Sequence, residues 1–186
     1  MGRLDEAKDG IKRAQELDPT SLILSSVEGC IYYIARDYDR AILLCRRTVE
    51  TEAGFYPANF WLGQAYEKKG MYREAIAAYE KAVSISAGSP EALASLGHAY
   101  AASGERAGAR KVLDQLSTLS KRRYISPYFT ALIYEGLGDK DLAIQYLELG
   151  LEQHSRSMPF LKVDPMLYSL RSDARFTNLI SRVGLR

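Results

Sequence analysis

The sequence has few of the residues that build metal sites, disulfide frameworks or membrane spans. Its 186 residues include 2 Cys, 2 His and 1 Trp, and no apolar run approaches the roughly 18 residues that span a bilayer. Cys30 and Cys45 match neither a CxxC pair nor a metal-ligand pattern. We therefore expect unpaired thiols in a reducing compartment, which favours a cytoplasmic protein. The net charge of +2 is too small to indicate a nucleic acid or an anionic membrane as partner.

Several residue types recur at a fixed spacing of 34 positions. Alanine does so at Ala7, Ala41, Ala75, Ala109 and Ala143. Glycine and tyrosine keep the same interval at Gly29, Gly63 and Gly97 and at Tyr32, Tyr66, Tyr100 and Tyr134. One period shared by several residue types predicts a stack of repeats, whose function lies in a surface and not in a catalytic site.

Each period reads as two helices joined by a tight turn, and residues 56–89 show this most clearly. Gly70 lies where an unconstrained backbone helps the first helix to end. Ala75 and Tyr79 then share one face of a second helix, because residues four positions apart lie above one another. Short side chains at Gly63 and Ala75 allow the two backbones to approach, and the Tyr79 ring fills the space beside them.

This unit resembles the tetratricopeptide repeat (TPR) family. The residues that carry the resemblance are Leu62, Gly63, Tyr66, Gly70, Tyr72, Ala75, Tyr79 and Ala82. The resemblance implies an all-α fold, a right-handed superhelical solenoid of antiparallel helix pairs. Its predicted parts are the second helix of a truncated repeat at 1–21, four units at 22–55, 56–89, 90–123 and 124–157, and C-terminal capping helices at 158–186.

The chain departs from the family pattern at the fourth place of each unit, which is often Trp in the family. The residues found there are Ser25, Asn59, Leu93 and Pro127. These departures leave the exact helix starts open and leave the fold unchanged.

The two ends of the repeat pattern differ. After residue 157 the period fails, and Asp164 with Pro165 is predicted to start a short helix. Ser172 with Asp173 is predicted to cap a final helix whose apolar face covers the last repeat. That face comprises Phe176, Leu179, Ile180 and Val183. The segment also resembles the C-terminal ends of TPR regions in bacterial multidomain regulators.

At the other end, Gly2 occupies the turn position of a repeat, so we expect the chain to begin midway through one. The helix predicted within residues 1–21 would then present an apolar stripe that is only partly covered. The stripe comprises Leu4, Ala7, Ile11, Ala14 and Leu17. We expect this helix either to fray or to associate with another molecule, including a second copy of the chain.

The resemblance further implies that the first helices line a concave groove that holds a peptide segment or a partner helix. The residues implied to line it are Ser26, Phe60, Ala94 and Tyr128 in one row, Cys30, Gln64, His98 and Leu132 in a second, and Tyr33, Glu67, Ala101 and Glu135 in a third. Family members that clamp a carboxylate tail use Lys, Arg and Asn on these helices, and the three rows contain none of them. We therefore expect an apolar or amphipathic ligand.

No residue pattern indicates catalysis, a cofactor or a metal. The sequence contains neither a Gly-rich phosphate loop nor a Ser or Cys triad, and His98 and His154 have no matched carboxylate pattern. Glu67 and Glu135 lie two repeats apart, so they are too distant to act as a catalytic pair. Cys30 is predicted to be a packing residue, because no basic neighbour lowers its pKa.

These observations predict a non-enzymatic scaffold for protein–protein interaction, as the C-terminal module of a larger bacterial regulatory protein. One alternative is a substrate-docking or sensor segment of a serine/threonine kinase or a winged-helix transcription regulator. A weaker alternative is nucleic-acid binding through basic helix ends such as Lys121, Arg122 and Arg123. The position of these three basic residues is more simply explained by the favourable interaction of cations with the C-terminal end of a helix.

Overall fold

The structure is a computed structural model that describes residues 4–184, and every regular element in that range is a helix. It forms two compact units, Met1–Gly88 and Ser89–Arg186. The first unit holds α1 (Leu4–Leu17), α2 (Leu22–Ile34), α3 (Tyr38–Thr51), α4 (Tyr56–Lys68) and α5 (Tyr72–Ile85). The second holds α6 (Pro90–Ala102), α7 (Arg106–Ser120), α8 (Pro127–Gly136), α9 (Lys140–Glu152), the 3-10 turns η1 (Met158–Phe160) and η2 (Pro165–Leu170), and α10 (Ala174–Arg182). The predicted all-α class is confirmed.

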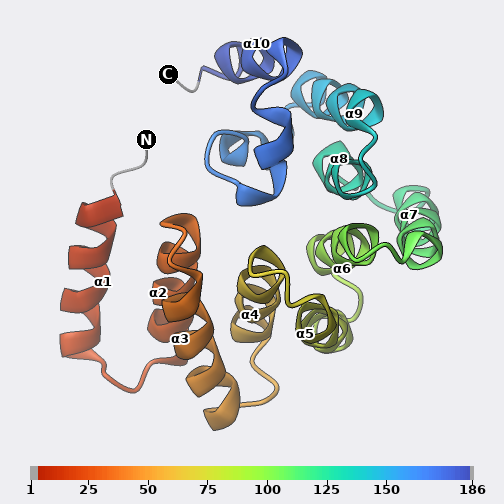
Figure 1. The fold of residues 1–186 in the computed structure, drawn as a ribbon. Coiled ribbons are helices and arrows are strands. Elements are labelled where there is room, and N and C mark those ends of the chain that lie inside the picture. The colour runs from red at the N-terminus through yellow and green to blue at the C-terminus, as the bar shows by residue number, and fades with distance from the viewer. Residues whose placement is uncertain (1–3, 185–186) are drawn as a thin grey trace. The chain divides into compact units, whose positions relative to one another are not determined.

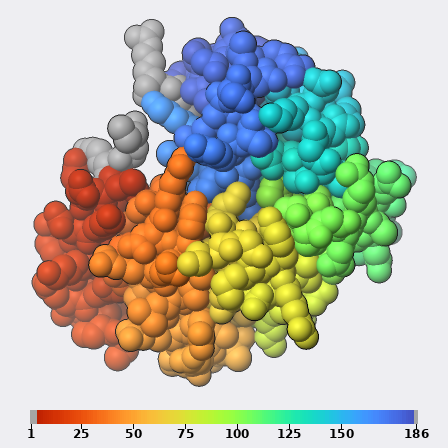
Figure 2. Space-filling model, viewed as in Figure 1, coloured from red at the N-terminus to blue at the C-terminus, as the bar shows by residue number. Residues whose placement is uncertain are grey.

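In the first unit, consecutive helices pack as neighbours. α2 packs against α1 and α3, and α4 packs against α2, α3 and α5 (Figure 1). Side chains fill the space between these ribbons, as the red and orange surfaces show (Figure 2). Each first helix therefore lies between its own second helix and the repeat before it.

The turns between paired helices use a left-handed residue. Gly70 has φ of 73° directly after α4, and the chain then re-enters a helix at Tyr72. Arg36 adopts the same conformation after α2 with φ of 64°, although it carries a side chain. Left-handed backbone is favourable for Gly and costs free energy for other residues. The repeat geometry thus requires this conformation even where Gly is missing.

The close approach predicted at Gly63 is present in the helix pair α4–α5. A Cβ built on Gly63 would lie 2.6 Å from the ring of Tyr79, which is completely buried. One repeat earlier, the corresponding Gly29 faces the sulfur of Cys45, where a Cβ would lie 2.5 Å away. Glycine on the first helix therefore makes room for whichever side chain the second helix places opposite.

The apolar stripe of α1 is only partly covered. Ile11 is buried, whereas Leu17 is 89% exposed. On α2 beside it, Ile23 and Val27 are 64% and 43% exposed. Gly2, on which the predicted register of this helix depends, lies outside the described residues.

In the second unit, α8, the first helix of the fourth predicted repeat, begins three residues after the predicted start of that repeat. The predicted repeat starts at 124, but α8 begins only at Pro127, with Ser126 as the N-cap that accepts a hydrogen bond from the Tyr128 amide. Proline lacks the amide that a position further inside a helix must donate, and it disfavours helical backbone in the residue before it. Pro127 is accommodated at the first helical position, and the chain from 121 to 126 stays outside the helices.

In the C-terminal segment, η2 and α10 each begin with an aspartate cap. Asp164 accepts a hydrogen bond of 2.8 Å from the Met166 amide at the start of η2, and Asp173 accepts one of 2.9 Å from the Arg175 amide at the start of α10. α10 packs against α9, and η2 packs against α8. Of the predicted apolar face of α10, Phe176 and Leu179 are completely buried.

Candidate binding surfaces

The twelve residues of the predicted groove lie on the first helices of the repeats. In the first unit these are α2 and α4, with Ser26, Cys30, Tyr33, Phe60, Gln64 and Glu67. In the second they are α6 and α8, with Ala94, His98, Ala101, Tyr128, Leu132 and Glu135. All of them except Cys30 and Glu135 are buried. Most of these side chains therefore pack inside the protein.

In the first unit, aromatic rings pack around the predicted groove residues Tyr33 and Phe60. Tyr33 lies 5.7 Å from Trp61 between ring centroids, which joins α2 to α4. Phe60 lies 5.1 Å from Trp61 and 6.3 Å from Tyr79, which joins α4 to α5. These tilted and edge-on contacts are favourable arrangements for aromatic pairs. Trp61, which does not occupy the Trp position of the family pattern, contacts both Tyr33 and Phe60.

The polar positions of the first unit are buried too. Glu67 is 3% exposed, and its carboxylate accepts a hydrogen bond of 2.8 Å from the hydroxyl of Tyr79. Gln64 lies one turn away on α4 and is 7% exposed. Among the described residues, the Ser26 hydroxyl is buried without a hydrogen-bond partner. Such a group costs free energy, because it has lost its hydrogen bonds to water and gained none in the protein.

A buried pair joins α6 to α8 in the second unit. His98 Nε2 lies 2.8 Å from Glu135 Oε2, and their side chains are 5% and 9% exposed. Gly136 makes this approach possible, because a Cβ there would lie 3.0 Å from the carbonyl oxygen of His98. A buried histidine bonded to one carboxylate is a structural polar contact, and the pair binds two neighbouring repeats together.

Tyr128 contacts the C-terminal segment. Its hydroxyl donates a 2.5 Å hydrogen bond to Asp164, and burial together with this carboxylate raises the pKa of Tyr128 well above its usual value. The same aspartate caps η2. One carboxylate thus holds both the first helix of the last repeat and the turn that covers it.

The two thiols differ in accessibility. Cys45 is completely buried, and this burial, together with nearby Cys30, raises its pKa to about 12. Cys30 is partly exposed. A thiol with so high a pKa has almost no thiolate at neutral pH, so reagents should reach Cys30 alone.

The basic run at the end of α7 is exposed. Lys121 is the C-cap of α7, and Arg122 and Arg123 follow it in the connection to α8. Cations at this end of a helix interact favourably with its dipole.

Within residues 4–184, we find no group of three or more His, Cys, Asp or Glu that could hold a metal ion. Over the same range, none of the helices is long and apolar enough to cross a bilayer.

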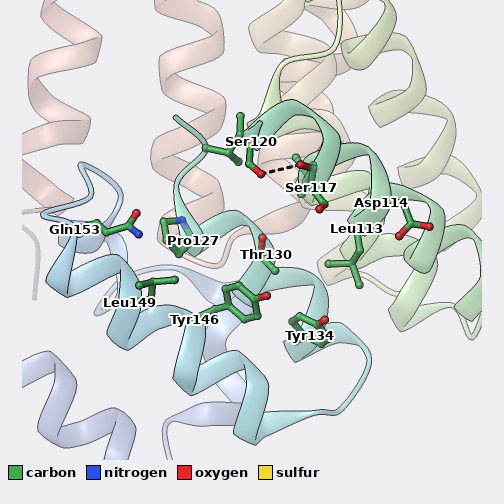
Figure 3. A pocket seen from close by; sticks show the side chains of 12 residues that line it. Leu113, Asp114, Ser117, Ser120, Pro127, Thr130, Tyr134, Tyr146, Leu149 and Gln153 are labelled. Atoms are coloured by element: carbon green, nitrogen blue, oxygen red, sulfur yellow. Dashed lines mark hydrogen bonds between the residues drawn. The ribbon is translucent and has the colours of Figure 1, made fainter. Parts of the chain in front are cut away.

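The structure also contains a groove that the sequence reasoning missed. It lies between α7 and α9, with α8 as its floor, and has a volume of about 460 Å³ (Figure 3). We call it the outer groove. Its lining residues are Leu113, Asp114, Leu116, Ser117, Ser120, Ile125, Pro127, Thr130, Tyr134, Tyr146, Leu149 and Gln153. The signal available in the sequence was Pro127, which shortens α8 and lengthens the preceding connection.

Comparisons with known proteins agree with this fold. A tetratricopeptide repeat family model matches residues 26–90 and 95–157, and a second model of that description matches 67–119. No curated protein matches significantly.

Several solved structures share the fold. A thermophilic TPR protein from Thermus thermophilus is 19% identical, with a TM-score of 0.70 over 99% of this chain and 92% of that chain. A MamA structure is 23% identical, with a TM-score of 0.59 over 85% of this chain and 92% of that chain. YrrB, described as a TPR protein with an unusual peptide-binding site, is 16% identical, with a TM-score of 0.56 over 95% of this chain and 91% of that chain. The chain belongs to the tetratricopeptide repeat family, whose fold is a scaffold for protein interaction.

Proposed function

We propose that this chain is a non-catalytic, cytoplasmic module that binds a peptide segment or a partner helix through its first helices. The face in question carries the three predicted rows, on α2 and α4 in the first unit and on α6 and α8 in the second. In a larger bacterial regulatory protein, such a module would recruit a partner for an effector domain. An equivalent role would be substrate docking or sensing for a kinase or a winged-helix regulator.

The observation that supports this face most directly is the buried Ser26 hydroxyl, which has no hydrogen-bond partner in the part of the chain that the structure describes. The buried Ser26 hydroxyl is an acceptor and donor that a bound backbone could use. The peptide-binding site named for YrrB is a further reason to expect peptide binding in this fold.

Cys30 makes the proposal testable without altering a buried side chain. A maleimide-linked photo-crosslinker should attach at Cys30 and not at Cys45, because Cys30 is partly exposed and Cys45 is buried. The labelled chain is irradiated in a lysate of the organism that encodes it. The captured protein is then purified and its binding to the unlabelled chain measured. We expect one protein to be captured, to be displaced by excess unlabelled chain, and to bind when purified.

The matched control moves the label to the outer surface. The double variant C30S/K81C carries its only accessible thiol on α5, where Lys81 is exposed. It should not capture the same protein. Equal capture from both positions would show that the first helices are not the binding face.

Self-association is a second candidate, supported by one specific observation. The apolar residues Leu17, Ile23 and Val27 on the neighbouring helices α1 and α2 are each exposed, and exposed apolar surface marks interaction sites when it is contiguous. Sedimentation equilibrium tests it, and L17E/V27E should remain monomeric at concentrations where the natural chain associates. A monomer over the whole range for the natural chain would exclude it.

Nucleic-acid binding remains the weakest candidate, supported by the exposed run at the end of α7. It predicts affinity for DNA or RNA that falls steeply with salt. Charge-neutral variants of Lys121 and Arg122 should then lower that affinity. Binding that does not respond to salt would exclude this role.

A further inference from the structure

The outer groove is separate from the first-helix face, because the second helices α7 and α9 form its walls. We propose that the outer groove binds a short extended peptide segment that carries apolar side chains beside a Lys or Arg. This binding site is additional to the proposed function and does not depend on it.

The groove exists because α8 begins late. α8 packs mainly against α6 and α9 and makes few contacts with α7. Pro127 sets the start of α8, and the connection from 121 to 126 leaves the wall of α7 uncovered. Ile125 and Pro127 themselves line the groove. A volume of about 460 Å³ lies within the roughly 300–1,000 Å³ usual for ligand sites.

The floor and walls offer apolar surface. Leu116 and Pro127 are buried at the bottom, and Leu149 on α9 is 37% exposed at the rim. Leu113 on α7 points toward the same space as Leu149 on the opposite wall (Figure 3). Covering this surface with an apolar side chain is favourable, since it removes apolar area from water on both partners.

The polar lining favours an extended segment over a helix. Hydroxyl and amide groups reach the groove from all three helices, namely Ser117, Ser120, Thr130, Tyr134, Tyr146 and Gln153. The Ser120 hydroxyl donates to the Ser117 carbonyl at 2.7 Å and keeps its oxygen available as an acceptor. A helix satisfies its own backbone groups, whereas an extended peptide must find partners in its binding site.

The negative charge of the groove lining indicates which side chain the bound peptide carries beside its apolar residues. Asp114 is the one charged residue among the described residues that line the groove, and it is exposed. It lies on α7 next to Leu113 (Figure 3). A carboxylate in this position favours a cation and disfavours an acidic segment. A Lys or Arg next to an apolar residue in the peptide would match this arrangement.

The test uses the whole chain and two blocked pentapeptides, Ala-Leu-Lys-Leu-Ala and its counterpart with Glu in place of Lys. Amide resonances of the ¹⁵N-labelled chain are followed during titration. We expect saturable shifts confined to α7, α8 and α9 with the Lys peptide, and weaker binding of the Glu peptide. Asp114→Lys should weaken binding of the Lys peptide by about fivefold or more, because it replaces attraction with repulsion.

Two further variants separate binding from folding. Ser117→Trp places a large ring at an exposed position of the groove and should abolish the shifts while the thermal unfolding curve stays cooperative. Glu80→Lys makes the same charge reversal at an exposed position of α5 and should leave the affinity unchanged. The absence of saturable shifts at the groove, or equal affinity of the natural chain and Asp114→Lys, would overturn the proposal. Shifts that depend on protein concentration without peptide would identify a second copy as the occupant and would also overturn it.

Discussion

The hydroxyl of Tyr128 on α8 donates a hydrogen bond to Asp164, which is also the N-cap of η2. This contact ties the C-terminal segment to the last repeat at a buried position, since Tyr128 is only 4% exposed. The segment is therefore held by a directed polar contact as well as by apolar packing.

Tyr128→Phe should loosen the C-terminal segment. The change keeps the ring and removes the hydroxyl, which leaves the Asp164 carboxylate without this donor, at a cost of about 1–3 kcal/mol. Hydrogen exchange of residues 158–170 should become faster, and urea unfolding should shift to lower concentration. Tyr124→Phe is the control, because Tyr124 is 62% exposed and should change neither measurement. Unchanged exchange in Tyr128→Phe would show that packing alone holds the segment.

Gly63→Ala should destabilise the chain, because its new Cβ would lie 2.6 Å from the ring of buried Tyr79. Overpacking of this kind costs about 1–3 kcal/mol. Gly10→Ala offers the opposite case. Gly10 lies inside α1, and a Cβ there would meet nothing within 4 Å.

We therefore expect Gly10→Ala to stabilise the chain slightly, by about 0.4–1 kcal/mol, through the lower entropy of the unfolded state. Urea unfolding measures both variants. Two changes of the same sign would contradict the assignment of Gly63 to a close helix approach.

A thiol reagent should modify Cys30 and spare Cys45 in the folded chain. Cys45 is completely buried and its pKa is raised to about 12, whereas Cys30 is partly exposed. At pH 8, a colorimetric thiol assay should detect one reactive group per folded chain and both groups in guanidinium chloride. Cys30→Ser should remove the fast group. Rapid modification of Cys45 in that variant would show that α2 and α3 open readily.

The carboxyl group of Asp173 should titrate at an unusually low pH, because its pKa is lowered in the folded chain. Hydrogen bonds from the Arg175 side chain and amide lower the pKa of Asp173 to about 2. A carboxyl whose pKa is lower in the folded state stabilises that state above its unfolded value, near 4. This stabilisation is lost as the pH falls from about 4 to about 2. Carbon NMR of the carboxyl group measures the midpoint directly.

Arg175→Ala should raise that midpoint toward 4, its value in unfolded chains. Asp173→Asn should remove the contribution of this group to acid sensitivity. A midpoint near 4 in the natural chain would show that the contacts between Asp173 and Arg175 do not persist in solution.

The repeat pattern by itself determined the family and the helix pairs. The spacing of small and aromatic residues specifies two helices that meet at Gly63 and turn at Gly70, since these contacts are local within one unit and recur in the next. Capping by Asp164 and Asp173 could also be predicted, because a cap depends on residues adjacent in the chain.

Only the tertiary structure showed how the side chains of different repeats combine. His98 with Glu135 and Tyr128 with Asp164 join residues far apart in sequence, so their pairing depends on how neighbouring helices pack. The burial of the predicted groove rows depends on the same packing. Pro127 was visible in the sequence as a departure, but the outer groove that it opens appears only where α7, α8 and α9 come together.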